Sequence, residues 1–252
     1  MQSLKCTALT FFIALVYTLL PVSAQAESIE VATDYWPPFR MTTASGDIIG
    51  LDVELMEEIG NRMGLKFEFI RYPWARCLTN LKSGESDFMT GLAKTPDRET
   101  FIAYTTPPYY TCHPTFYTQK GMGQTIQSYA DLQGHEVGYV RASKYFDQFD
   151  NDTTLSKQDL TDEKTMLRML VSGRLGVIIG TDCQITHDIQ SMGLGDKVEP
   201  IAYKPDVPIH LYIGISRNSP YLRRMNDFNA ILAEMISDGT IEMIAARYFT
   251  HE

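Results

Sequence analysis

Gly50-Leu51-Asp52-Val53-Glu54-Leu55 opens the part of the sequence that decides the fold, and Thr95-Pro96-Asp97-Arg98 closes it. Apolar residues recur at helical spacing over residues 52–63, which predicts a helix with Asp52 as its N-cap and Gly64 as its C-cap. The remainder predicts a strand over residues 65–70, a helix ending at Gly84, and a strand over residues 87–91. Strand, helix and strand in this order are typical of a mostly parallel sheet covered by helices.

A second set of alternating strands and helices lies further along the chain. A strand is expected over residues 29–32, before the opening stretch. Further strands are expected over residues 136–140 and 176–180, and helices over residues 162–172, 219–237 and 241–248. Two proline-bearing passages, residues 107–114 and 203–208, should carry the chain to a second lobe and back. Because ligands of open α/β sheets bind at the carboxyl ends of strands, two facing lobes predict a cleft that closes on a small molecule.

The N-terminus predicts export. Residues 1–5 form a short basic start, residues 7–20 form an apolar run that is short for a membrane span, and Ala24-Gln25-Ala26 is a small-residue cleavage site. We therefore expect a cleaved signal peptide over residues 1–26 and a periplasmic protein; an uncleaved anchor is the alternative. The formal net charge of -9 argues against a nucleic-acid partner, because an acidic chain repels phosphate backbones.

Further motifs follow the opening stretch in a fixed order: Asp131-Leu132-Gln133-Gly134, Ser172-Gly173-Arg174-Leu175 and Asp238-Gly239-Thr240. The ordered set, from about residue 29 to residue 249, resembles the bacterial extracellular solute-binding proteins of family 3, the polar-amino-acid type. The resemblance implies an α/β fold of two lobes, the type II periplasmic-binding-protein fold. In that fold each lobe is a mostly parallel sheet flanked by helices, and two hinge crossings join the lobes.

The same resemblance implies a division of the chain and a role for it. Lobe 1 would cover residues 27–111, lobe 2 residues 112–206, and the return to lobe 1 residues 207–252. The protein would bind a small polar solute bearing a carboxylate and deliver it to an ABC-type permease in the inner membrane. We expect a monomer that is not an enzyme and that uses no cofactor and no metal.

Family resemblance also assigns the residues of the binding site. Arg98 would grip the ligand carboxylate, a pairing that is strong where water is excluded. Trp36, Trp74 and Tyr35 would form aromatic walls, although Trp74 could equally be a core residue. The other expected residues are Gly91 and Thr95 in lobe 1 and Ser143, Lys144, Thr181 and Asp182 in lobe 2. Ser143 and Lys144 should open a helix whose free N–H groups hold an anionic group, with a plain N-cap as the alternative for Ser143.

Two positions depart from the family pattern. Ala93 stands where the family usually carries Ser or Thr, so one ligand hydroxyl is missing. Thr181 stands where the family carries an acid for the ligand ammonium, and Asp182 follows one residue later. These differences leave open whether an α-ammonium group is recognised. If it is, Asp182 should bind it more strongly than Thr181.

Three cysteines follow the signal segment, and an exported chain meets an oxidising environment. In the fold that the resemblance implies, the strand entering lobe 2 runs antiparallel beside residues 176–180. That arrangement predicts a disulfide between Cys112 and Cys183 and a free, buried thiol at Cys77, with two separate thiols as the alternative.

Two other functions remain open. Similar lobes in cyclohexadienyl dehydratases catalyse an elimination, which needs a general acid in the cleft; Asp182 and Glu163 are the candidates here. A periplasmic sensory ligand carrier is the other alternative. The five histidines show no metal-ligand spacing, and the sequence contains no nucleophile elbow, P-loop or dinucleotide-binding motif.

Overall fold

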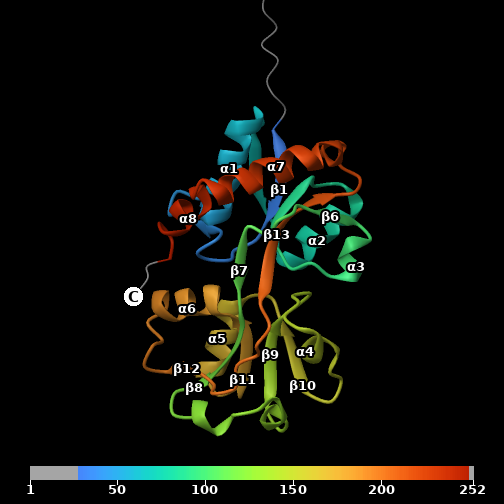
Figure 1. Cartoon of the computed structure of the whole chain (residues 1–252). Helices are drawn as coiled ribbons and strands as arrows, with labels where there is room; N and C mark the ends of the chain where they lie inside the picture. The colour runs from blue at the N-terminus through green and yellow to red at the C-terminus, as the bar shows by residue number, and fades with distance from the viewer. Residues whose placement is uncertain (1–27, 250–252) are drawn as a thin grey trace, which may run out of the picture.

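A computed structural model describes residues 28–249, so the predicted signal peptide over residues 1–26 lies outside the described part. The chain forms two lobes, each built on its own sheet (Figure 1). Two strands, β7 (Tyr110–Cys112) and β13 (Ile209–Ser216), lie side by side between the lobes. The predicted two-lobe α/β fold is therefore confirmed.

The first lobe contains a sheet with the strand order β4-β1-β5-β13-β6, and β7 also pairs with β13. Besides β7 and β13, its strands are β1 (Ile29–Thr33), β4 (Phe67–Arg71), β5 (Phe88–Leu92) and β6 (Ile102–Tyr104), with a small hairpin of β2 (Met41–Thr42) and β3 (Ile48–Ile49). The helices are α1 (Leu51–Met63), α2 (Trp74–Ser83), α3 (Pro96–Glu99), α7 (Met225–Ser237) and α8 (Thr240–Ala245). The 3-10 turn η3 (Pro220–Arg224) precedes α7, so the helix expected over residues 219–237 starts as a tighter turn.

The start of α1 differs from the sequence prediction. The helix ends at Gly64 in the left-handed conformation, as predicted, but Asp52 lies inside the first turn and its N-cap is Gly50. Leu51 and Asp52 donate their backbone N–H groups to the carbonyls of Pro38 and Phe39, at 3.3 and 3.0 Å. Because these carbonyls satisfy the helix start, no side-chain cap is needed and Asp52 is free for another role.

Only glycine fits at position 50. Its φ of 138° lies in the region that residues with a side chain avoid, and a Cβ there would come within 2.1 Å of the Phe39 carbonyl oxygen. The close approach of Gly50 to Phe39 fixes the loop between β1 and β2 against the start of α1. That loop carries Asp34, Trp36 and Arg40.

The second lobe contains a sheet with the strand order β10-β9-β11-β8-β12. Its strands are β8 (Pro114–Gln119), β9 (Glu136–Val140), β10 (Ser156–Leu160), β11 (Val177–Thr181) and β12 (Val198–Pro200). Its helices are α4 (Asp147–Asn151), α5 (Glu163–Val171) and α6 (Asp182–Ser191), with the 3-10 turns η1 (Gly123–Thr125) and η2 (Tyr129–Leu132). Strand β9 has the predicted bounds, and Asp162 caps α5 by accepting a hydrogen bond from the Thr165 N–H.

Both sheets are mixed rather than mostly parallel. β1 is parallel to β4 and β5, and β9 is parallel to β10 and β11. β8 and β13 run antiparallel to their neighbours, because each enters its sheet directly from the other lobe instead of through a helix. We keep the divisions after residues 111 and 206 as proposed lobe boundaries. None of the helices within residues 28–249 has the length and apolarity that a membrane crossing requires.

Candidate functional site

A cavity lies between the two lobes. Lobe 1 contributes Asp34, Trp36, Arg40, Trp74, Gly91, Ala93 and Arg98, lobe 2 contributes Val140, Ser143, Lys144, Tyr145, Glu163, Gly180 and Thr181, and β13 contributes Ile209 and Leu211. Seven of the ten residues expected at the site therefore line one cavity. Tyr35, Thr95 and Asp182 do not line it.

Arg98 is buried in this cavity, and none of the described residues offers it a carboxylate partner. Its side chain follows β5 on the short helix α3, where the Thr95 hydroxyl accepts a hydrogen bond from the Arg98 N–H at 3.3 Å. The guanidinium donates to the Ala93 carbonyl at 2.9 Å and, across the cleft, to the Ala142 carbonyl at 2.8 Å.

Arg98 is 5% exposed, and within residues 28–249 no acid approaches its guanidinium within 4 Å. Burial lowers the pKa of Arg98. A buried guanidinium with only carbonyl partners is suited to receive an anion, since removing the charge from water is otherwise uncompensated.

Arg40 is a second buried arginine, and it was not predicted from the sequence. Two carboxylates, those of Asp34 and Asp52, neutralise its charge. Arg40 contacts Asp34 at 2.7 Å and also forms an ion pair with Asp52, whose other oxygen accepts from the Tyr109 hydroxyl at 2.6 Å. Burial alone would lower the pKa of Arg40, yet the adjacent Asp34 and Asp52 raise it overall. Burial raises the pKa of Asp52, against the effect of Arg40. The network holds the floor of the cavity in place.

Trp36 stacks above this network. Its ring lies 4.4 Å from that of Phe39, and the Arg40 guanidinium is 5.0 Å from its centroid. Gly91 makes this packing possible, because a Cβ there would come within 2.6 Å of Arg40 Nη1 and 3.1 Å of Trp36 Cζ3. Gly91 therefore lines the cavity through its lack of a side chain.

Trp74 begins α2 on the other side of the cavity. Its ring centroid lies 5.7 Å from the Arg98 guanidinium carbon, a cation–π distance. Its indole N–H is buried and has no hydrogen-bond partner within the described residues. The expected aromatic wall and the expected carboxylate-binding arginine are thus in contact.

Residues 141–144 of lobe 2 form a turn, not the start of a helix. Ser143 donates its N–H to the Val140 carbonyl at 3.0 Å, and the next helix, α4, begins only at Asp147. Helix N–H groups are therefore not available at Ser143, and it is not an N-cap. Lys144 and Ser143 line the cavity by virtue of this turn, and no acid lies within 4 Å of Lys144 Nζ among residues 28–249.

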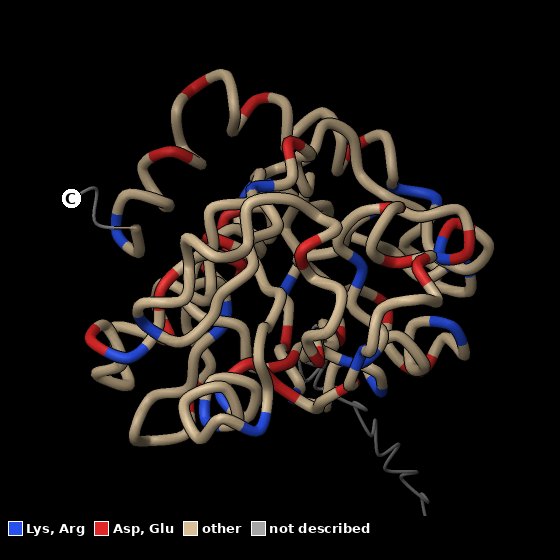
Figure 2. The backbone as a smooth tube through the Cα atoms, turned by 90° about the horizontal axis from the view of Figure 1, so that it is seen from below, with Lys and Arg blue, Asp and Glu red and all other residues tan. Residues whose placement is uncertain are grey.

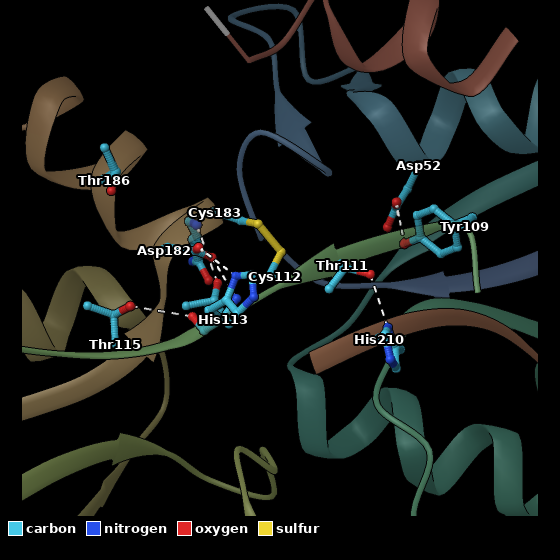
Figure 3. The surroundings of a disulfide bond; sticks show 12 residues. Asp52, Tyr109, Thr111, Cys112, His113, Thr115, Asp182, Cys183, Thr186 and His210 are labelled. Carbon is cyan, nitrogen blue, oxygen red and sulfur yellow. Dashed lines mark hydrogen bonds and ion pairs between the residues drawn. A yellow bond between two sulfur atoms is a disulfide. The ribbon is translucent and has the colours of Figure 1, made fainter. Parts of the chain in front are cut away.

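Asp182 is turned away from the cavity. One of its oxygens accepts from the His113 backbone N–H at 2.8 Å, and the other lies 3.2 Å from His113 Nδ1 (Figure 3). Thr181 does line the cavity, while its hydroxyl caps α6 by accepting from the Gln184 N–H. The expectation that Asp182 takes a ligand ammonium is not supported by this placement, because its oxygens already have partners outside the cavity.

Tyr35 lies at the rim and joins the lobes. Its hydroxyl accepts a hydrogen bond from Lys164 Nζ at 2.7 Å, and the same ammonium lies 4.3 Å from its ring centroid. Arg71 lies over the same ring at 5.6 Å. Tyr35 is therefore a contact between the lobes.

Glu163, the first residue of α5, lines the cavity from lobe 2. The residue is half-buried, and burial raises the pKa of its carboxyl to about 8, with a further contribution from Asp34 across the cleft. From the sequence, Glu163 was a candidate only for a general acid in the cleft, and the structure does place it at the cavity.

The predicted disulfide is present. Cys112 at the end of β7 and Cys183 in the first turn of α6 are joined, with their Cα atoms 5.8 Å apart (Figure 3). Cys77 is a free, buried thiol, as expected, and burial raises its pKa to about 12. The bridge ties the entry into lobe 2 to the helix that follows β11.

The charged residues are scattered along the chain. In the view of Figure 2, basic and acidic positions are interspersed around the molecule and do not separate into two faces. A continuous basic surface is what a nucleic-acid-binding protein usually presents.

The chain is similar in sequence to a known protein family and to several named proteins. The sequence profile of the bacterial extracellular solute-binding proteins, family 3, matches residues 29–251. The putative ABC transporter arginine-binding protein 2 of Escherichia coli K12 is 25% identical over 89% of this chain and 91% of its own length. The histidine-binding periplasmic protein of Salmonella typhimurium LT2 is 24% identical over 98% of this chain and 97% of its own.

Solved structures agree on the fold. A histidine kinase sensor domain described as similar to periplasmic binding proteins superposes with a TM-score of 0.78 at 21% identity. The match covers 89% of this chain and 96% of that chain.

Proposed function

This chain belongs to family 3 of the bacterial extracellular solute-binding proteins, and from that premise we propose that it closes on a small polar solute bearing a carboxylate. An amino acid or a related compound is the solute class that its relatives support, since their names specify arginine and histidine. The protein works as a monomer in the periplasm and delivers the solute to an ABC-type permease.

The observation that carries this proposal is the buried Arg98 guanidinium, which contacts both lobes and lacks a carboxylate partner among the described residues. A ligand carboxylate would supply the missing negative charge at the point where the lobes meet. Trp74 and Trp36 line the same cavity and offer apolar faces for the rest of the solute.

A thermal-shift panel tests the proposal. The twenty common L-amino acids, succinate, glutarate and putrescine would each be added to the purified mature protein. A ligand at ~100 times its Kd should add about 2.7 kcal/mol to the free energy of unfolding and raise Tm by several degrees. We expect at least one carboxylate-bearing compound to do so and putrescine, which has no carboxylate, to do nothing. Stabilisation by putrescine alone would contradict the proposal.

One observation favours a second function. The Glu163 carboxyl lines the cavity and holds its proton near neutral pH, which is the property that a general acid needs. An enzyme like the cyclohexadienyl dehydratases would use such a group for elimination from a cyclic carboxylic acid. Turnover of prephenate or arogenate, followed by absorbance of the aromatic product, would establish that activity, and its absence would leave binding alone.

A further inference from the structure

We propose that Glu163, together with Asp34, holds a cationic nitrogen of the solute, so that the ligand is zwitterionic. This inference rests on the proposed function, because it concerns the same cavity. It assigns to Glu163 the role that the sequence left open when Thr181 replaced the family acid and Asp182 followed it. Glu163 is thereby a residue that determines specificity.

Few acidic residues could bind a cationic group of the ligand in this cavity. Asp34 and Glu163 are the two acidic residues that line it, one from each lobe. Asp182 is held by His113 outside the cavity. Asp34 uses one oxygen to bind Arg40, because its Oδ1 accepts hydrogen bonds from both Nε and Nη2 of that guanidinium. Among the described residues, Asp34 and Glu163 are therefore the carboxyl groups that a cationic group in this cavity would meet.

The local charge near these two acids is negative. Arg40 carries one positive charge and is shared between two carboxylates, Asp34 and Asp52. Other charged or titratable groups around Glu163 are Asp162 and Lys164 on its own helix, His187 and Asp188 on α6, and Tyr145 after β9. Lys164 Nζ is directed to the Tyr35 hydroxyl, so it does not neutralise Glu163 by direct contact.

Hydrogen-bond acceptors are in excess behind Glu163. Gln184 is 1% exposed and its Oε1 has no donor within residues 28–249, while its Nε2 donates to Asp188 at 3.3 Å. The other oxygen of Asp188, a fully buried residue, also lacks a donor within these residues. Buried acceptors without donors are costly, and neither residue lines the cavity, so a cationic group of the ligand would meet Glu163 rather than these oxygens.

Cationic side chains line the same cavity. Arg98 and Lys144 are among them, and neither has an acid within 4 Å among the described residues. The cavity therefore offers these two cations as well as the acids Asp34 and Glu163. A molecule that carries both a carboxylate and a cationic nitrogen matches this combination of charges.

Proton release on binding provides the test. In the ligand-free protein the pKa of Glu163 is about 8, so at pH 7 most of the molecules hold this proton. A cationic nitrogen favours the ionised carboxylate and expels the proton, so affinity should rise up to ~tenfold per pH unit as pH increases toward 8. A ligand with a second carboxylate in place of the cationic nitrogen would bind more weakly as pH increases, because it favours the protonated form of Glu163.

The experiment titrates the tightest binder among the twenty L-amino acids, and succinate and glutarate, by calorimetry at pH 7 in phosphate and in Tris. The difference in heat between the two buffers counts the protons released. Wild type should release up to about one proton, and Glu163→Gln should release none and bind the amino acid at least ~10-fold more weakly at pH 8. Glu136→Gln, an exposed acid of the same lobe, should behave as wild type.

Each outcome decides between the two proposals. Equal affinity and equal proton release in wild type and Glu163→Gln would overturn this inference and leave solute binding intact. Succinate or glutarate binding as tightly as any amino acid, or proton uptake on binding, would overturn it too. If none of these compounds binds the wild type, the proposed function falls first, and this inference falls with it.

Discussion

Arg40 and Arg98 line one cavity, yet their surroundings assign them different tasks. Arg40 is 2% exposed and is neutralised by Asp34 and Asp52 inside lobe 1. Removing one partner of such a buried pair costs about 3–5 kcal/mol of stability. Arg40 therefore stabilises the loop between β1 and β2. Arg98 is almost as buried, and within the described part of the chain its side chain donates to carbonyl groups alone, which leaves its charge for a ligand.

Glu163 makes the ligand-free protein less stable as pH rises. Its pKa is 4.5 in the unfolded chain and about 8 in the folded protein, so the folded state holds more protons between these values. Its contribution to stability is fully present below pH 4.5 and is lost as pH rises to 8. Asp188, with its pKa raised from 3.8 to about 6, acts in the same direction at lower pH.

Urea unfolding at pH 5 and pH 8 checks this effect. Between these values the wild type should lose ~2 kcal/mol more than Glu163→Gln, a figure reduced from the full shift because the carboxyl is partly open to the cavity. Glu136→Gln serves as the control, since its side chain is exposed. The same pH dependence in wild type and Glu163→Gln would contradict the raised pKa.

The sequence predicts a residue's place at the cavity where that place follows from its position next to the end of a strand or the start of a helix. Arg98, Trp36 and Trp74 reach the cavity because each follows or begins an element at the cleft edge of its sheet. Their binding roles stay predictions. Arg40 was not predictable as a cavity residue, because no spacing links it to Asp52; only the fold brings the two together. Glu163 was a candidate for a general acid in the cleft, but no spacing links it to Asp34.

At the scale of elements, the crossing strands carry the connection between the lobes. β7 pairs with the first half of β13, with Cys112 opposite Ile209, so the two crossings form a single antiparallel ribbon. The disulfide then fastens the end of β7 to α6. This ribbon explains why both sheets contain antiparallel strands, which strand-helix-strand patterns in the sequence could not reveal.

Loss of the disulfide should destabilise the protein. The bridge joins residues 71 positions apart, and closing a loop of this length removes about 4 kcal/mol of chain entropy from the unfolded state. The double variant Cys112→Ser, Cys183→Ser should unfold at a clearly lower urea concentration than wild type. Cys77→Ala, which removes a buried thiol without breaking a crosslink, should cost ~1 kcal/mol. A double variant as stable as wild type would show that the bridge adds nothing.

Element boundaries were predicted best where a chemical signal marks them. Gly64 and Asp162 end and begin helices as their residue types predict. Asp52 was misplaced as a cap, because carbonyls of Pro38 and Phe39 satisfy the helix start instead. A capping signal in the sequence competes with such long-range backbone contacts, which the sequence does not display.

At the scale of the whole molecule, the lobes are in contact on both sides of the cavity. Arg98 reaches the Ala142 carbonyl of lobe 2, and Lys164 reaches the Tyr35 hydroxyl of lobe 1. Both contacts favour a closed arrangement. A ligand that binds the closed arrangement more tightly than the open one shifts the population toward it.

Tyr35→Phe should speed ligand release. The variant keeps the ring that lies beside Lys164 but removes the hydroxyl that accepts its hydrogen bond. Losing one such bond costs ~0.5–1.5 kcal/mol, and the effect should fall on the dissociation rate more than on the association rate. Stopped-flow tryptophan fluorescence measures both rates. Tyr139→Phe, a lobe 2 tyrosine outside the cavity, is the control, and unchanged dissociation in Tyr35→Phe would contradict this role.

The central claim is that Arg98 holds the carboxylate of a bound solute, and calorimetric titration of Arg98→Ala tests it most directly. The titrant is the carboxylate compound that stabilises the wild type most in the thermal-shift panel. The account predicts a loss of ~2–5 kcal/mol in binding free energy, at least ~30-fold in Kd. Arg76→Ala, which removes an exposed arginine paired with Glu85 in the same lobe, should bind as wild type does. Equal affinity in Arg98→Ala and wild type would contradict the account.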